Sequence, residues 1–142
     1  QRDISTDVDF YKKHVNRDFR IKYTGLQISD TYSQRDDYFT IKPENGNKLL
    51  IVKFKVTNNT KKTATINLGD VHIDYRLYLS DEKICKPMIT LLDTDLNYIK
   101  YAVEGGKSDE AVLVFDVPQK IKREGLILSM SMEGKNTEFE LK

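Results

Sequence analysis

NKLLIVKFKVTNN, residues 47–59, is an alternating apolar segment that runs directly into a polar turn. The apolar side chains that share one face of the extended chain are Leu50, Val52, Phe54 and Val56. The side chains of the other face are Lys53, Lys55 and Thr57. This period of two is typical of a strand with one buried face, and the Asn-Asn pair after it indicates a turn. The segment therefore predicts a central strand of a half-buried sheet.

The same alternation recurs at short intervals on both sides of this segment. It is present in residues 19–28, 71–79, 112–117, 126–132 and 137–141. Gly25 shifts the inward parity within the first of these strands, as a bulge would. Pro87 confines residues 84–92 to a sheet edge or an irregular crossing, because proline cannot donate a ladder hydrogen bond. Shorter extended pieces are predicted at residues 38–41 and 61–68.

Residues 92–103 do not follow the period of two. Asp93 or Thr94 could cap a short helix here, and the Gly-Gly pair at 105–106 would end it. The apolar side chains that would share one helix face are Leu96, Ile99 and Val103. The whole pattern predicts an all-β fold, an immunoglobulin-like antiparallel β-sandwich of seven or eight strands with one short helix near residues 93–103.

The length of 142 residues fits one hydrophobic core. Residues 1–16 have no clean period, and we expect them to form an N-terminal arm or linker. A helical turn near residues 8–13 would be ordered only if it docked on the rest of the chain. Residues 17–142 are predicted to form the sandwich domain.

The charges of the chain nearly cancel, because 23 Lys and Arg stand against 22 Asp and Glu, for a formal net charge of +1. Such a balance gives no strong field to attract nucleic acid, so no nucleic-acid partner is expected. No apolar run reaches the roughly 18–20 residues needed to cross a bilayer, so we expect no transmembrane segment. Cys85 is the one cysteine of the sequence, which excludes an internal disulfide and favours a packing role for its thiol.

The order of the predicted pieces resembles a family of bacterial immunoglobulin-like domains of unknown function from surface lipoproteins. The names of this family refer to a telomeric repeat-binding factor and to an immunoprotective extracellular antigen. The pieces that carry the resemblance are Gly46, then LLIVKFKVTNNT, then ATINLGDVHIDYRLYLSD, then EGGKSDEAVLVFDVP. The resemblance covers residues 17–142 and lies in spacing and alternation. Glu104 stands where a proline is common, and no glycine follows Asp81, but both departures fall in turns.

The resemblance implies an extracellular or cell-envelope location in a Gram-positive bacterium, with a lipid anchor on a cysteine upstream of residue 1. The sequence starts at Gln1 without an apolar signal region. We expect either that a signal segment has been removed, which favours export, or that the sequence is a fragment.

The candidate metal ligands are Asp93, Asp95, Asn97 and Glu104. They fall at positions 1, 3, 5 and 12 of a calcium-loop pattern, in which oxygen atoms surround a hard cation. Position 6 of that pattern turns sharply and is normally glycine, whereas here it is Tyr98. A capped turn is therefore favoured over a calcium site, and we predict no metal and no cofactor.

His72 lies between Asp70 and Asp74 on one face of a predicted strand. A metal needs ligands that converge to about 2 Å, which a flat row of side chains cannot supply alone. A solvated strand face is favoured, and His72 is kept as a candidate for binding. The sequence has no G-x-S-x-G motif, and His14 is the only other histidine. We predict no catalytic residues and no enzymatic activity.

Aromatic side chains are the remaining candidates for a binding surface. They are Tyr98 and Tyr101 near the predicted helix, and Tyr32, Tyr38 and Phe39 in the long polar loop before the central strand. Such side chains form contact patches for glycans or proteins, and the lack of tryptophan favours a protein. The alternative is that most of them cover the open ends of the sandwich.

These features predict a non-enzymatic exported envelope domain that acts as an adhesion, scaffolding or ligand-presenting module. Its partner would be a protein or a cell-envelope component. Two alternatives stay open. One is a small-molecule or metal-binding extracytoplasmic module that uses His72 or the loop at Asp93, and the other is an accessory domain of a larger surface enzyme.

Overall fold

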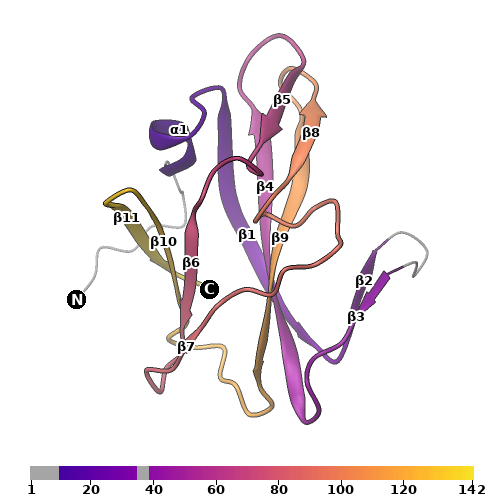
Figure 1. Ribbon diagram of the computed structural model, residues 1–142, viewed down its shortest axis with the longest axis vertical. Coiled ribbons are helices and arrows are strands. Elements are labelled where there is room, and N and C mark those ends of the chain that lie inside the picture. The colour runs from indigo at the N-terminus through magenta and orange to yellow at the C-terminus, as the bar shows by residue number, and fades with distance from the viewer. Residues whose placement is uncertain (1–9, 35–38) are drawn as a thin grey trace.

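The computed structural model describes residues 10–34 and 39–142. Within these ranges the chain forms one short helix and eleven strands (Figure 1). In chain order they are α1 (Phe10–His14), β1 (Phe19–Ser29), β2 (Tyr32–Gln34), β3 (Phe39–Ile41), β4 (Asn47–Asn58), β5 (Ala64–Asn67), β6 (Asp74–Tyr78), β7 (Ile84–Cys85), β8 (Lys100–Val103), β9 (Ser108–Pro118), β10 (Ile127–Met132) and β11 (Lys135–Glu140).

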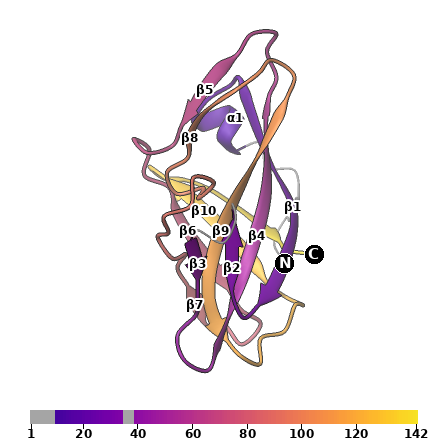
Figure 2. The ribbon, with the colours of Figure 1, turned by 90° about the vertical axis from the view of Figure 1, so that its right-hand side faces the viewer.

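Two antiparallel sheets form a sandwich around the main core. β4 lies between β1 and β9 in a three-stranded sheet, and the second sheet has the order β11-β10-β6-β7. The pairs β2-β3 and β5-β8 are separate two-stranded sheets. Figure 2 shows β4 and β9 running together along most of the molecule. The predicted all-β sandwich is confirmed, and β7 is an edge strand, as Pro87 indicated.

The NKLLIVKFKVTNN segment is β4, and its two faces have different surroundings. Leu50, Val52, Phe54 and Val56 are buried in the core between the two main sheets. Leu49 and Ile51 point the opposite way and are also buried, in a second apolar cluster with Leu92, Val112 and Val114. The side chains that pack over this second cluster are Tyr32, Ile41 and Met88. The outer face of the three-stranded sheet is therefore covered by the β2-β3 pair and by the chain that follows β7.

The glycine bulge predicted in β1 is confirmed. The register of β1 against β4 shifts between Tyr23 and Gly25. Ile21 and Tyr23 are buried before the shift, and Leu26 and Ile28 pack against the same core after it. The extra residue therefore keeps apolar side chains of opposite parity on one face of the strand.

The described part of the predicted N-terminal arm is docked on the sandwich. α1 buries Phe10 and Tyr11 in the main core, and the Phe10 ring packs edge-on against Tyr11 and against His14. Residues 1–9 lie outside the described residues. The boundary between arm and domain at residue 16 stays a prediction.

The short helix predicted near residues 93–103 is wrong. Turns and an isolated bridge between Asp95 and Val112 occupy residues 93–98, and β8 begins at Lys100. Leu96 and Ile99 are buried, as their spacing suggested, but turns bring them to the core. An aspartate that bonds to nearby backbone offers the chain an alternative to helix, and Asp95 does so here.

Two tyrosines meet inside the core. The Tyr11 hydroxyl shares a hydrogen bond with the Tyr75 hydroxyl at 2.7 Å, and it lies 3.3 Å from the Met130 sulfur, which accepts a hydrogen bond from it. Burial raises the pKa of Tyr11 well above its ordinary value, and the adjacent Tyr75 raises it further. Burial also raises the pKa of Tyr75, although its hydrogen bond with Tyr11 offsets part of the rise. Both hydroxyls are therefore held neutral in the folded protein.

The buried tyrosine pair predicts a loss of stability at alkaline pH. Unfolding returns both groups to a pKa of about 10, so the unfolded chain releases protons that the folded chain retains. The free energy of unfolding should be unaffected by this pair below about pH 10, and above it should fall by up to about 1.4 kcal/mol per pH unit for each tyrosine. Denaturant titrations from pH 8 to pH 11.5 measure this slope. In the double variant Tyr11→Phe/Tyr75→Phe the slope should be smaller, and an unchanged slope would contradict the assignment.

A candidate binding surface on the crossing between β7 and β8

The chain that joins β7 to β8, residues 86–99, is here called the crossing. It is fastened to the edge of β9 by backbone hydrogen bonds. The Met88 amide donates to the Val114 carbonyl at 2.7 Å, and the Leu96 amide donates to the Val112 carbonyl at 2.8 Å. The Val112 amide in turn donates to the Thr94 carbonyl at 2.8 Å. The crossing therefore covers an edge of the three-stranded sheet and keeps a fixed position on it.

The buried side chain of Asp95 holds the turn at the centre of the crossing. Its side chain is 1% exposed. One carboxylate oxygen accepts hydrogen bonds from the Thr90 amide and hydroxyl, at 3.0 and 2.7 Å. The other accepts from the Asn97 amide and side-chain nitrogen, at 2.9 and 2.8 Å. Four donors thus occupy both oxygens, so Asp95 holds the turn together.

The four candidate metal ligands are not arranged around one point. Asp95 and Asn97 bond to each other, whereas Asp93 lies on an exposed turn and Glu104 lies in the turn that leads to β9. In residues 10–34 and 39–142, no three His, Cys, Asp or Glu side chains are grouped as a metal site would need.

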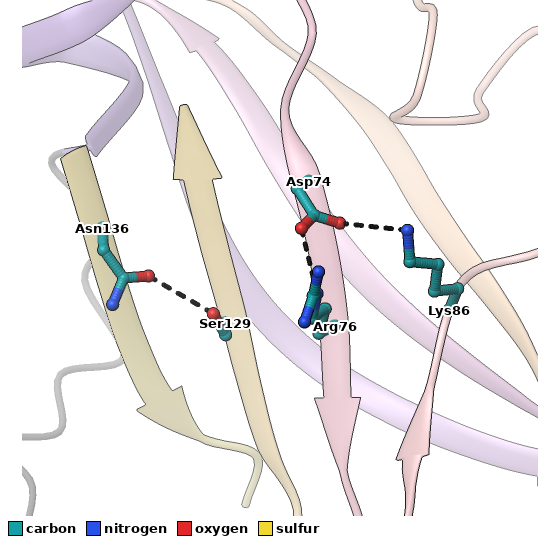
Figure 3. A network of polar contacts seen from close by, with 5 residues as sticks. All are labelled: Asp74, Arg76, Lys86, Ser129 and Asn136. Atoms are coloured by element: carbon teal, nitrogen blue, oxygen red, sulfur yellow. Dashed lines mark hydrogen bonds and ion pairs between the residues drawn. The ribbon is translucent and has the colours of Figure 1, made fainter. Parts of the chain in front are cut away.

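The row of Asp70, His72 and Asp74 is not a strand face, because β6 begins only at Asp74. His72 is exposed, and Asp70 lies in a turn where it accepts a hydrogen bond from Asn67 at 3.3 Å. Asp74 is paired with Arg76 at 2.9 Å and with Lys86 at 3.7 Å (Figure 3). Ser129 and Asn136, also drawn in Figure 3, form a separate contact at 3.3 Å. The charges on this face are therefore paired in a surface network.

Two of the predicted aromatic candidates do come together. Tyr98 and Tyr101, with Asp93 and Lys100, line a hollow of about 340 Å³ at the end of the crossing. Burial raises the pKa of Tyr101, and the charges of Asp109 and Glu110 raise it further. Burial likewise raises the pKa of Tyr98. The hollow therefore presents two neutral tyrosines between one acidic and one basic side chain.

The other aromatic candidates are Tyr32, Tyr38 and Phe39. Tyr38 lies outside the described residues, and so does the side chain of Phe39, although its backbone is part of β3. Tyr32 packs against the second apolar cluster, on the outer face of the three-stranded sheet and not at an open end of the sandwich.

The sequence patterns did not predict the most exposed apolar side chains of the crossing. Ile89 is 74% exposed and Leu91 is 75% exposed, and among the described residues only Ile84, at 52%, is a third large exposed apolar side chain. Met88, Thr90 and Leu92 alternate with them and are buried or partly buried. A run of consecutive apolar residues in a chain packed on one side must turn half of them outward. The apolar residues within 88–92 could therefore have indicated exposed side chains in this segment.

These two side chains also line a groove. It has a volume of about 510 Å³ and is lined by residues 40–42, at β3, and by residues 88–92 of the crossing. Ile41, Met88 and Leu92 are apolar lining residues that also belong to the second cluster, whereas Lys42 is exposed. In Figure 1 the β2-β3 pair, whose strand β3 contributes lining residues to this groove, stands out from the sandwich.

The fold and this surface define a β-sandwich domain in which two of the three large exposed apolar side chains of the described residues lie on one connecting segment. The chain belongs to the family described as a domain of unknown function, DUF4352, whose model matches residues 13–138. No curated protein matches the chain. No helix in the described ranges is long and apolar enough to cross a membrane.

The chain is also similar to solved structures at low sequence identity. A β-sandwich protein from Clostridium difficile is 14% identical, with a TM-score of 0.59, over 99% of this chain and 92% of that chain. A conserved hypothetical protein from Bacillus anthracis is 12% identical, with a TM-score of 0.49, over 88% of each chain. A Bacillus subtilis protein (ycdA) proposed to be a lipoprotein is 17% identical, with a TM-score of 0.44, over 87% of this chain and 36% of that chain.

Proposed function

We propose that this domain is a non-enzymatic extracytoplasmic binding module that holds a protein partner at the crossing. The observation that carries the proposal is the exposure of Ile89 and Leu91, at 74% and 75%. Neighbouring groups on both sides of this pair are suited to contact, with the apolar groove at β3 and the tyrosine hollow at Lys100. Surfaces of this kind, with apolar and aromatic groups on a rigid support, are typical of protein-binding sites.

The rigidity of the crossing supports a binding role. Its backbone bonds to β9 and the four hydrogen bonds on Asp95 fix the segment that presents Ile89 and Leu91. Less conformational entropy is lost on binding when the contact residues are already held in place. The same engagement of Asp95, and the pairing of Asp74 with two basic groups, supports a role for these carboxylates in structure.

The extracytoplasmic placement rests on the resemblance to surface lipoprotein domains. The finer likeness to immunoprotective antigens, the immunoglobulin-like type of the sandwich and the choice between adhesion and scaffolding stay expectations. Protease treatment of intact cells that carry the full-length protein tests the location. Digestion of the domain at the cell surface is expected, and complete protection until the cells are lysed would contradict it.

Site-specific photo-crosslinking tests the binding role. A benzophenone amino acid replaces Leu91 in the full-length protein in its native cells, and the matched control carries it at Lys12, an exposed position on α1. We expect a discrete protein adduct from position 91 and none from position 12. Adducts from neither position, or equal adducts from both, would refute a binding surface at the crossing.

A further inference from the structure

The two walls of the groove each present the edge of a chain segment to it. A strand that turns one face to a hollow lines it with every second residue, because successive side chains point to opposite sides. This groove is instead lined by consecutive residues, 40–42 on one wall and 88–92 on the other. Backbone groups of both segments are therefore accessible from the groove.

These two edges are not paired with each other. β3 pairs with β2 alone, and the two strands form a separate two-stranded sheet. Within residues 10–34 and 39–142, no backbone hydrogen bond joins residues 40–42 to residues 88–92. The groove therefore lies between two segments whose facing edges have room for a further strand.

Hydrogen bonds fix the direction of the backbone in the crossing. The Met88 amide donates to the Val114 carbonyl on the edge of β9. The Thr90 amide donates to Asp95. Backbone groups of successive residues in an extended chain point to opposite sides, so those of Ile89 point away from β9. They have no hydrogen bond within the described part of the chain, and an edge with open N–H and C=O groups is a template for pairing with another chain.

We propose that the partner held at the crossing enters this groove with an extended peptide segment, which adds as a short β-strand between β3 and residues 88–92. The inference rests on the proposed function, since it specifies how the partner binds. Main-chain hydrogen bonds hold the backbone of the segment, and its alternate side chains pack on the lining. A bilayer is a poor occupant, because hydrocarbon offers no hydrogen bonds to the open backbone groups of the walls.

The lining determines which side chains the segment carries. The apolar lining residues are Ile41, Met88, Ile89, Leu91 and Leu92. Lys42 is the only charged residue among the described lining residues, and it is exposed. It forms no ion pair with a described residue. A segment with apolar residues at alternate positions and an acidic residue opposite Lys42 therefore complements the groove.

The added strand is expected to be short and its binding weak. β3 has three residues, and the chain of the other wall bends at Leu91. Few main-chain hydrogen bonds thus offset the entropy that the segment loses on binding. We expect a dissociation constant between about 10 μM and 1 mM for an isolated peptide.

Selection from a displayed library of short linear peptides on the purified protein is the first test. We expect the selected peptides to alternate apolar residues and to carry an acidic residue. Leu91→Ser should weaken binding of a selected peptide at least about tenfold, whereas Ile84→Ser should leave it unchanged. Ile84 is a matched control because it is an exposed aliphatic side chain that does not line the groove. A selection without any peptide sensitive to Leu91→Ser would overturn the proposal.

Amide hydrogen exchange tests the main-chain hydrogen bonds. A selected peptide should slow exchange at the Ile89 amide at least about tenfold, because the added strand accepts its hydrogen bond. The amide of His72, an exposed residue outside the groove, should be unaffected. The same peptide N-methylated at every residue keeps its side chains but loses its donors, and should bind at least about tenfold more weakly. Unchanged exchange at Ile89, or full affinity of the N-methylated peptide, would overturn strand addition.

A charge reversal tests the contact at Lys42. Lys42→Glu should reverse the preference, so that a peptide with lysine in place of its acidic residue binds more tightly than the original. Lys62→Glu is the matched control, because Lys62 is exposed in a turn outside the groove and this variant should keep the acidic preference. Misfolding could weaken binding but would not reverse the preference. An acidic preference retained by Lys42→Glu would show that the segment does not enter the groove.

These results and the photo-crosslinking at Leu91 separate the inference from the proposed function. An adduct with a different protein, combined with peptides that fail these tests, overturns strand addition but keeps the binding module. Self-association of the purified protein that Leu91→Ser abolishes would assign the surface to a second copy, and would overturn the inference. The absence of any adduct at position 91 refutes both.

Discussion

Replacement of Asn58 by alanine is expected to lower the free energy of unfolding by about 3–4 kcal/mol. Asn58 ends β4 and is fully buried. Its side-chain nitrogen donates to the Lys62 carbonyl and to the Val103 carbonyl, both at 2.8 Å. Its side-chain oxygen accepts from the Thr60 amide at 2.8 Å and from the Thr60 hydroxyl at 2.7 Å. One amide therefore joins the end of β4 to the following turn and to the end of β8.

The free energy of unfolding falls because alanine cannot form the hydrogen bonds that the Asn58 side chain makes with these groups. The carbonyl of Val103 sits in a buried bond, and a buried polar group without a partner costs about 1–3 kcal/mol. The lost side-chain volume adds a small cavity. Guanidinium denaturation of wild type and variant measures the difference, provided that the denaturant dependence is the same for both.

Asn59 provides a matched control in the same dipeptide. Its side chain is exposed, and the hydrogen bond that it makes, to the Asp18 carbonyl at 2.9 Å, comes from its backbone amide. Asn59→Ala should therefore change the free energy of unfolding by less than about 0.5 kcal/mol. Similar losses for the two variants would show that the Asn-Asn turn owes its stability to local backbone preference, and would refute the role assigned to Asn58.

The alternation of apolar and polar residues predicted most of the sandwich, because a strand with one buried face needs an apolar residue at every second position. In β4 the inward positions from Leu50 to Val56 are all apolar, and so the strand, its central place and the turn at Asn58 could all be inferred. The same holds for the bulge at Gly25, where the parity of apolar residues changes. β6 was predicted too long, because Val71 and Ile73 continue the period while the chain there is still leaving a turn.

The error at residues 93–103 has a physical source. Leu96, Ile99 and Val103 are all buried, and their spacing is the same whether a helix or a set of turns brings them to the core. The hydrogen bonds of Asp95 with Thr90 and Asn97 favour the turns over the helix. These bonds depend on the path of the chain, which the composition does not specify. Local propensity gives way to side-chain to backbone bonds in such segments.

The candidate surface could be predicted only in part. Tyr98 and Tyr101 were selected by residue type, and the structure places them in one hollow. Ile89 and Leu91 were not selected, because Pro87 indicated only that residues 84–92 form a sheet edge or an irregular crossing. Whether such residues face the core or solvent is set by how the crossing attaches to β9, through the amides of Met88 and Leu96. Those contacts are far apart in the sequence.

The two departures from the family pattern fall at turns, as the sequence suggested. The residue after Asp81 is Glu82, which adopts a φ of 71° in the turn between β6 and β7. This left-handed conformation is easiest for glycine, so the glycine that is common there has a backbone reason. The turn still closes, with the Leu79 amide donating to the Lys83 carbonyl at 2.8 Å.

Gly105→Ala is expected to lower the free energy of unfolding by about 2–3 kcal/mol, through contact with the turn that Asn58 holds. A β-carbon on residue 105 would lie 2.5 Å from the carbonyl carbon of Lys61, 2.6 Å from its oxygen and 2.9 Å from the Lys62 amide nitrogen. These are backbone atoms, so no side chain can move aside to make room. The turn at residues 60–62 must shift, and the bonds from Asn58 to Lys62 and Thr60 shift with it.

Gly25→Ala is the matched control for Gly105→Ala. A β-carbon at Gly25 meets no atom within 4 Å, so this variant should change the free energy of unfolding by no more than about 0.5 kcal/mol in either direction. The double variant Asn58→Ala/Gly105→Ala should lose less than the two single losses combined, because both act on the turn at residues 60–62. Additive losses would mean that Gly105 and Asn58 stabilise the fold independently. Such a result, or a Gly105→Ala variant as stable as the wild type, would contradict the close packing of Gly105 against Lys61.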